Sequence, residues 1–169
     1  MKSKAVYPGS FDPFTYGHRD ITERGLKEFN HIVVLVCEMP DKYYMFNPDE
    51  RVEVARESLE NFADRVGVDK LGNKLLVDFV RSVGSRYIIR GWRDKLDLEY
   101  ENRRVLANKT LDPGIETILY EALEEYRFLS SSLIREIVKC KGGLERIKEY
   151  VHPFVYEKLK NKIKDPAFK

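Results

Sequence analysis

The sequence predicts a single α/β domain over residues 1–169, built on a doubly wound, mostly parallel five-stranded sheet with C-terminal helices at about 131–162. Three observations predict this class. Short apolar runs alternate with longer segments of helical periodicity, which is the order of βαβ units. The run HIVVLVC at 31–37 is continuously apolar and largely β-branched, as in strands covered on both faces. The composition, 43% hydrophobic and 34% charged residues, fits one globular core.

Local signals place the elements of the first half. KAVY at 4–7 is a short apolar strand, and the helix expected over 18–29 has its apolar residues roughly on one face. After the strand at 31–37 comes a loop over 38–46. Asn47-Pro48-Asp49-Glu50 then predicts a helix start, with an N-cap Asn, a Pro in the first turn and a capping-box Glu. That helix runs to about residue 62, and a short strand is expected over 66–68.

Similar signals place the elements of the second half. Gly84 is a natural C-cap for a helix over 75–83, and the strand RYII is expected to stop at Arg90-Gly91. Asp112-Pro113-Gly114 predicts a turn between the next helix and strand. The last helix is expected to be interrupted at His152-Pro153. The remaining expected elements are a helix over 96–111, a strand over 115–120 and helices over 130–141 and 144–162.

Cysteine content and charge exclude several classes of protein. Cys37 and Cys140 are far apart and form no C-x-x-C pair, so neither a zinc site nor a redox pair is indicated. No signal peptide or membrane-length apolar run is present, so a cytoplasmic protein without membrane contact is expected. Residues 133–169 carry ten Lys and Arg against five Asp and Glu. Their alternation with apolar residues favours a solvated helix face over a nucleic-acid site.

The first candidate site is the loop VYPGSFDPFTYGH at 6–18, directly after the first strand. In a parallel sheet, ligands bind beyond the carboxyl ends of the strands. A helix that starts at Gly17-His18 offers unpaired N–H groups to a phosphate, and His18 adds a side-chain donor. The structural alternative is that the glycines and Pro13 only shape a turn and that His18 is a surface residue.

Three further groups of anion-binding residues follow other strands. Arg90 and Arg93 can clamp phosphates, or instead form surface ion pairs with Asp94, Asp97 or Glu99. The serines at 130–132 can cap a helix and present donors to a phosphate. Lys42 lies in the loop after the second strand, where a single lysine is usually solvated. Together these groups predict a polyphosphate site on one side of the sheet.

Missing motifs narrow the chemistry. The sequence contains no GxxxxGK[ST], no GxGxxG and no GxSxG, which argues against a P-loop enzyme, a dehydrogenase and a hydrolase triad. No carboxylate cluster suggests a metal cage, so Mg²⁺ is expected to be carried mainly by the phosphates of a nucleotide and by water.

The ordered set of motifs resembles the phosphopantetheine adenylyltransferases, members of the nucleotidylyltransferase superfamily with its Rossmann-like fold. The resemblance begins in Tyr7-Pro8-Gly9-Ser10-Phe11-Asp12-Pro13 and in Thr15-x-Gly17-His18. It continues to about residue 160 through Lys42, Met45-Phe46, Glu50-Arg51, Leu75-Leu76-Val77-Asp78-Phe79, Ile89-Arg90-Gly91-x-Arg93, Leu98-Glu99-Tyr100-Glu101 and Ser130-Ser131-Ser132. It implies transfer of the adenylyl group of ATP to 4′-phosphopantetheine, giving dephospho-coenzyme A and pyrophosphate by direct in-line attack of the substrate phosphate.

The same resemblance implies roles for individual residues. His18 stabilises the transition state, while Lys42 and Arg90 bind the acceptor phosphate. The resemblance also implies that Ser10 and Leu76 bind the acceptor substrate. The residues implied for ATP are Ser10, Phe11, His18, Gly91, Trp92, Arg93, Glu101, Tyr126, Arg127, Phe128, Leu129, Ser130, Ser131 and Ser132. The family further implies a homohexamer and coenzyme A as a feedback ligand.

Several positions depart from the family pattern. Trp92 replaces a smaller aliphatic residue, Tyr126 replaces a frequent Trp, the segment 121–125 is unusually acidic, and 102–104 is more polar. Three alternative functions are compatible with parts of the sequence. The first is another nucleotidylyltransferase, which acts on cytidine nucleotides or on nicotinamide or nicotinate mononucleotide. The second is a non-catalytic nucleotide-binding protein. The third is a nucleic-acid-binding role for the basic C-terminal segment. The features that match the pantetheine branch are Lys42, Leu75-Leu76 and Glu99-Tyr100-Glu101.

Overall fold

The computed structural model describes residues 2–40 and 42–165, so Met1, Asp41 and 166–169 of the expected domain lie outside the described residues. Five strands form one sheet in the order β3-β2-β1-β4-β5, and all four neighbouring pairs are parallel. The strands are β1 (Lys2–Gly9), β2 (Phe29–Val36), β3 (Val66–Lys70), β4 (Tyr87–Trp92) and β5 (Glu116–Glu121). The predicted doubly wound fold is confirmed, with a sheet that is entirely parallel in the described residues.

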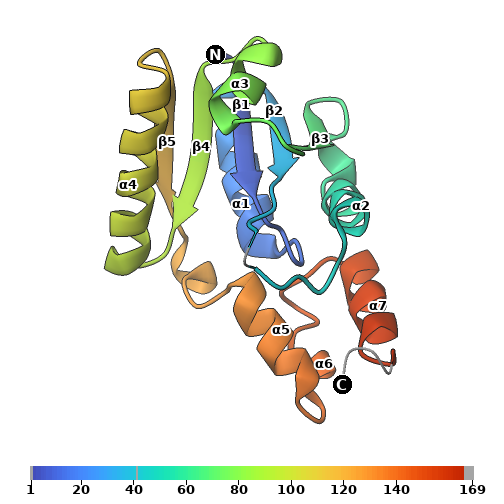
Figure 1. The fold of residues 1–169 in the computed structure, drawn as a ribbon. Coiled ribbons are helices and arrows are strands. Elements are labelled where there is room, and N and C mark those ends of the chain that lie inside the picture. The colour runs from blue at the N-terminus through green and yellow to red at the C-terminus, as the bar shows by residue number, and fades with distance from the viewer. Residues whose placement is uncertain (1, 41, 166–169) are drawn as a thin grey trace.

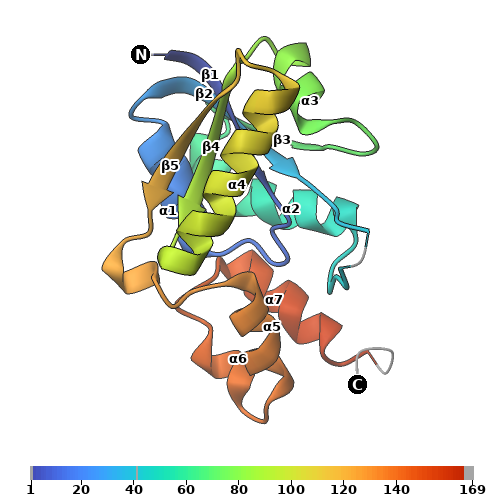
Figure 2. The same cartoon turned by 60° about the vertical axis from the view of Figure 1, so that its left-hand side comes forward.

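Helices cover both faces of this sheet (Figures 1 and 2). They are α1 (Tyr16–Gly25), α2 (Pro48–Ser58), α3 (Leu76–Ser82), α4 (Lys95–Leu111), α5 (Ser131–Lys139), α6 (Gly143–Arg146) and α7 (Pro153–Lys162), with 3-10 turns η1 (Glu60–Phe62) and η2 (Glu124–Tyr126). One face packs on α1 and α2, and the other on α3 and α4. The helices α5 to α7 lie together below the arrowheads of the strands (Figure 1).

The two faces of the sheet have separate cores because side chains alternate along each strand. In β2, Ile32 and Val34 point into the core shared with α1, α2 and the C-terminal helices. Val33 and Leu35 of the same strand point into the smaller core under α3. The strand is therefore buried on both faces, as its continuous apolar run predicts.

Predicted boundaries hold where short-range hydrogen bonds fix them. Asn47 caps α2 by accepting the Glu50 N–H at 2.9 Å, and the Glu50 carboxylate accepts the Asn47 N–H at 2.8 Å. Gly84, with φ of +70°, ends the α3 segment in the left-handed region. The Asp112 side chain accepts the Gly114 N–H at 2.9 Å and closes the predicted turn.

Other boundaries are set by tertiary pairing and were predicted wrongly. The strand expected to stop at Arg90-Gly91 continues to Trp92, because β5 pairs with it as far as Trp92 and Glu121. The first helix spans Tyr16–Gly25 rather than 18–29, and Phe29 joins β2 opposite Lys2. The helices expected over 130–141 and 144–162 are the shorter α5, α6 and α7, with turns between them. The predicted interruption at His152-Pro153 is confirmed, since His152 is the N-cap of α7 and Pro153 its first residue.

The basic C-terminal segment packs back onto the domain. Lys158 pairs with Glu53 of α2 at 2.6 Å, and Lys162 pairs with Glu50 at 2.9 Å. Two basic side chains of the C-terminal segment are therefore paired with carboxylates of the same domain. None of the described helices combines the length and apolar composition that a bilayer span requires.

Candidate functional site

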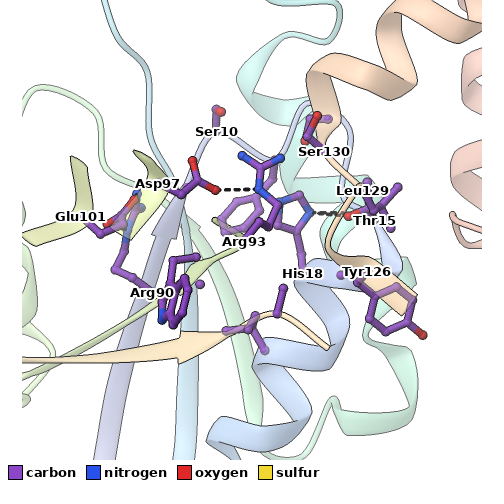
Figure 3. Close-up of a pocket in the computed structure, with 18 of the residues that line it drawn as sticks. Ser10, Thr15, His18, Arg90, Arg93, Asp97, Glu101, Tyr126, Leu129 and Ser130 are labelled. Atoms are coloured by element: carbon purple, nitrogen blue, oxygen red, sulfur yellow. Dashed lines mark hydrogen bonds and ion pairs between the residues drawn. The ribbon is translucent and has the colours of Figure 1, made fainter. Parts of the chain in front are cut away.

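The site lies where the strand order reverses. β1 is flanked by β2 on one side and by β4 on the other, so the chain leaves their carboxyl ends in diverging directions. A cavity of about 280 Å³ opens there (Figure 3). Most of the sequence-predicted residues line it, namely Ser10, Phe11, His18, Lys42, Arg90, Gly91, Trp92, Arg93, Glu101, Tyr126, Leu129, Ser130, Ser131 and Ser132. The structure therefore brings residues of the four loops named from the sequence together around one cavity.

His18 is held in one orientation by Thr15. The Thr15 N–H donates to His18 Nδ1 at 3.0 Å, and the Thr15 hydroxyl lies 3.0 Å from the same nitrogen (Figure 3). A neutral ring that accepts at Nδ1 carries its proton on Nε2. The start of α1 thus fixes the tautomer and leaves an Nε2–H donor for a ligand in the cavity.

The aromatic rings of Phe11 and Phe14 support this imidazole from behind. Their ring centroids lie 5.1 and 5.3 Å from that of His18. Phe11 adopts φ of +49°, a left-handed conformation that is uncommon outside glycine. Strain of this kind is concentrated at functional sites. The loop therefore spends conformational energy to place the Phe11 ring beneath His18.

Gly9 is needed for this arrangement, and its replacement gives a first prediction. A Cβ atom at position 9 would lie 2.7 Å from Cζ of Phe11. We expect Gly9→Ala to displace that ring and with it His18, lowering kcat about 10-fold, since small misplacements of reacting groups are costly. Steady-state kinetics measure this. Gly67→Ala is the control, because a Cβ atom at position 67 would lie 3.5 Å from His31 Nε2, an ordinary contact distance. Equal losses in both variants would contradict this role of Gly9.

The electrostatic environment keeps His18 neutral. Burial, reinforced by the positive charges of Arg93, Arg90 and Lys42, lowers the pKa of His18 to about 3. The imidazole therefore acts in the free protein as a neutral hydrogen-bond donor rather than as a cation or a general base near pH 7.

This shift predicts a pH dependence of stability. Between the ordinary histidine pKa of about 6.5 and the lowered value, the unfolded chain binds a proton at His18 that the folded chain does not. Stability is therefore lost as the pH falls below 6.5, by up to about 1.4 kcal/mol per pH unit from this group. Urea unfolding of wild type and His18→Ala at pH 7, 6 and 5 should show a shallower acid loss in the variant. Parallel pH profiles would contradict the assignment.

Arg90 and Glu101 form an ion pair in the cavity wall. Arg90 Nε donates to Glu101 Oε2 at 2.7 Å, the Nη2 group donates to the other carboxylate oxygen, and Nη1 donates to the Pro8 carbonyl. Arg90 lies on β4 and Glu101 is the buried residue of α4. The pair thus joins the end of β1, β4 and α4, and it presents the remaining N–H groups of Arg90 to the cavity.

Arg93 and Lys42 supply the other two positive charges. Arg93 Nε donates to Asp97 Oδ2 at 2.7 Å (Figure 3), which is one of the ion pairs expected as an alternative to phosphate binding. Lys42 Nζ donates to Ser10 Oγ at 2.9 Å. Partial desolvation and the nearby charge of Arg135 lower the pKa of Lys42, and a bound phosphate would favour its charged form again.

The three serines contribute mainly through the backbone. The Ser130 hydroxyl accepts the Leu133 N–H at 3.0 Å, the Ser131 hydroxyl donates to the Pro13 carbonyl at 2.8 Å, and the Ser132 hydroxyl accepts from Arg135 at 3.2 Å. The first N–H groups of α5 have no partner within the helix. The N-terminal end of α5 therefore faces the cavity and offers N–H groups that suit an anion.

Three residues implied by the family resemblance do not line the cavity. Arg127 forms ion pairs with Glu121 and Glu124, and Phe128 packs edge-on against Tyr150. Leu76 packs against the smaller core under α3. Conversely, the cavity wall includes Asp97 and Tyr100, which were not among the predicted site residues. From the sequence, Asp97 is only a possible surface ion-pair partner, and Tyr100 is only part of a motif of the family. The four-residue spacing from Arg93 to Asp97 was the available signal.

Metal binding by protein groups alone is not favoured. Among the described residues, no three His, Cys, Asp or Glu side chains are arranged to hold an ion. Both carboxylates of the wall, Asp97 and Glu101, are already paired with arginines.

Comparisons with known proteins show the family of the chain. Residues 6–137 match the family model described as cytidylyltransferase-like. The chain is 43% identical over 161 residues to the phosphopantetheine adenylyltransferase of Methylobacillus flagellatus, covering 95% of this chain and 97% of that protein. It is 43% identical over 160 residues to the enzyme of that name from Thermotoga neapolitana, with 92% and 96% covered.

Solved structures share the fold at much lower identity. A nicotinic acid mononucleotide adenylyltransferase from Plasmodium falciparum, complexed with NaAD, superposes with a TM-score of 0.72 at 20% identity over 100% of this chain and 99% of that one. A bifunctional NMN adenylyltransferase/ADP ribose pyrophosphatase from Francisella tularensis, complexed with AMP and an MN ion, has a TM-score of 0.69 at 13% identity, covering 99% and 51%.

Proposed function

Since the chain belongs to the phosphopantetheine adenylyltransferase family, we propose how its cavity carries out the reaction of that family. The enzyme makes dephospho-coenzyme A from ATP and 4′-phosphopantetheine. In the proposed mechanism, an oxygen of the pantetheine phosphate attacks the α-phosphorus of ATP. The bond to the bridging oxygen of the β-phosphate breaks, and pyrophosphate leaves. The protein contributes positioning and charge stabilisation, with no covalent intermediate.

The observation that carries this proposal is the neutral, oriented His18 beside three cations. Its Nε2–H donates to the phosphoryl oxygens as negative charge grows on them. Lys42, Arg90 and Ser10 hold the acceptor phosphate. The start of α5 at 130–132 holds phosphates of the nucleotide.

The adenosine part is assigned to the other end of the cavity. Gly91, Trp92 and Arg93 at the end of β4, together with Tyr126 and Leu129, line that wall. Glu101 contributes to it through Arg90. Contacts from Leu76, Arg127 and Phe128 stay predictions from the family resemblance, because these side chains lie outside the cavity wall.

We propose Mg²⁺ as the cofactor, carried by the phosphates of ATP with water completing its coordination. The donor set of the described residues fits this mode, since the two carboxylates in the wall are both paired with arginines. When bound, the ion neutralises part of the phosphate charge. The protein side chains orient the two substrates and stabilise the remaining charge.

We further propose that the enzyme is a homo-oligomer, and the family resemblance predicts a hexamer. We also propose that it is located in the cytoplasm and that coenzyme A inhibits it. The oligomer is supported by α4, which spans seventeen residues and buries only Glu101. Its leucines at 96, 106 and 111 are exposed in the described chain, as expected of a face that packs on another copy. Light scattering after size exclusion tests this, and a monomer at micromolar concentration would contradict it.

Pyrophosphate release tests the reaction itself. Purified protein is incubated with Mg²⁺, ATP and 4′-phosphopantetheine, and parallel reactions replace the acceptor by nicotinate mononucleotide or ATP by CTP. We expect release that needs both ATP and the pantetheine substrate. Release with nicotinate mononucleotide alone would instead favour the activity named for the structural neighbours, and ATP binding without turnover would favour a non-catalytic protein.

A further inference from the structure

The loop that carries Lys42 is exposed and irregular, yet it is held at both ends by buried charged residues. Arg51 of α2 and Asp12 of the β1–α1 loop are both completely buried. Neither lines the cavity. Burial of an ionised side chain is costly unless it is paired or hydrogen-bonded, so the contacts of these two residues indicate what their charges serve.

Arg51 fixes the start of the loop. Its Nη1 group donates to the Cys37 carbonyl at 3.2 Å and to the Ser10 carbonyl at 3.0 Å, while Nη2 donates to Glu38 at 2.9 Å. One guanidinium thus joins the residue after β2 to the residue after β1. Ser10 is also the residue whose hydroxyl accepts from Lys42.

Asp12 fixes the end of the loop. One carboxylate oxygen accepts the Met45 N–H at 2.8 Å, and the other accepts the Phe46 N–H at 2.9 Å. Arg135 of α5 donates to the main-chain carbonyl of Asp12 and pairs with its carboxylate at 3.5 Å. The residue therefore ties the loop that bears Lys42 to the loop that leads to His18.

Tyr44 connects these fixed ends to Lys42. Its ring packs on the Arg51 guanidinium at 4.1 Å, and its hydroxyl accepts the Met39 N–H at 2.7 Å. The Lys42 N–H in turn donates to the Met39 carbonyl at 3.1 Å, and Lys42 Nζ lies 5.6 Å from the Tyr44 ring centre. The backbone of Lys42 is thus fixed by contacts that lead back to buried charges.

From this arrangement we infer that Asp12 and Arg51 are positioning residues, which act through Lys42 by holding its loop against Ser10. The inference rests on the proposed role of Lys42 in binding the acceptor phosphate. A lysine has a long, flexible side chain, so a fixed backbone is the means by which the protein confines its ammonium group to one place. Neither positioning residue needs to touch a substrate.

A double-mutant cycle between Asp12→Asn and Lys42→Ala tests this inference. Asn has nearly the same shape as Asp and keeps the main-chain carbonyl for Arg135. It removes the carboxylate that pairs with Arg135, and it offers one acceptor where two N–H groups need one each. We expect Asp12→Asn to lower kcat/KM for 4′-phosphopantetheine about 10-fold or more, mainly through KM. The Kd for ATP, read from the fluorescence of Trp92, the one tryptophan of the sequence, should stay within about twofold.

In the Lys42→Ala background the same substitution should change kcat/KM by less than about twofold, because the residue through which Asp12 acts is absent. Full additivity of the two effects would overturn the inference while leaving the reaction intact. A Lys42→Ala variant with wild-type kinetics would overturn it in a different way, by removing the proposed role of Lys42.

A control variant separates a loss of stability from a loss of positioning. Asp112→Asn is the matched control, since Asp112 also accepts a main-chain N–H and pairs with an arginine, but in a turn away from this loop. It should leave kcat/KM within about twofold of wild type. If Asp12→Asn does not fold, Arg51→Lys takes its place in the cycle. It keeps the charge, but its single ammonium group cannot reproduce the Nη1 contacts to Ser10 and Cys37 together with the Nη2 contact to Glu38. The same non-additivity with Lys42→Ala is expected, and additivity would again overturn the inference.

Discussion

Replacing His18 by alanine is expected to lower kcat by about 10²- to 10³-fold while leaving the Kd for ATP within about threefold. The lost group is the neutral Nε2–H that Thr15 orients by its hydrogen bond to Nδ1. It donates most strongly to phosphoryl oxygens when their charge is largest, which is in the transition state. Its removal therefore affects the chemical step more than substrate binding.

Two readouts on the same protein separate these effects. Pyrophosphate release gives kcat, and the fluorescence of Trp92 gives the Kd for ATP, because this residue lies in the cavity wall. His31→Ala is the control, since His31 lies on β2 and is not part of that wall. If His18→Ala kept more than about a quarter of the wild-type kcat, the cations alone would account for catalysis.

The sequence predicted the fold well because the relevant signals are local. The β-branched run of β2, the capping box at Asn47 and the C-cap at Gly84 each act over a few residues. Alternation of strands and helices then restricts the topology to a parallel sheet with the loops after its strands at one edge. The location of the cavity follows from that topology and from the residues in those loops.

The partners of the charged residues could not be predicted in the same way, because they depend on contacts between distant segments. Arg90 was expected to follow its strand, but pairing with β5 extends β4 past it. Its partner Glu101 is eleven residues away, across the cavity wall. The buried roles of Asp12 and Arg51 depend on N–H groups and carbonyls of other loops, which leave no trace in side-chain spacing.

The second large effect is expected at the pair of Arg90 and Glu101, whose side chains are only 18% and 7% exposed. Glu101→Ala should lower the free energy of unfolding by about 3 kcal/mol, because it leaves a mostly buried guanidinium uncompensated. It should also lower kcat/KM by about 100-fold, since Arg90 loses the contact that aims its remaining N–H groups into the cavity. Denaturant unfolding and steady-state kinetics measure the two losses.

The double variant Arg90→Met/Glu101→Leu separates stability from function at this pair. Apolar side chains of similar volume often replace a buried ion pair with little loss of stability, so the double variant should unfold within about 1 kcal/mol of wild type. It should stay as inactive as the single variant, because no guanidinium remains for the acceptor phosphate. Glu116→Ala is the control, because it breaks an exposed ion pair between the start of β5 and Arg86, the residue before β4, and it should cost under about 1 kcal/mol. Recovery of both stability and activity in the double variant would mean that the pair serves only to hold β4 against α4.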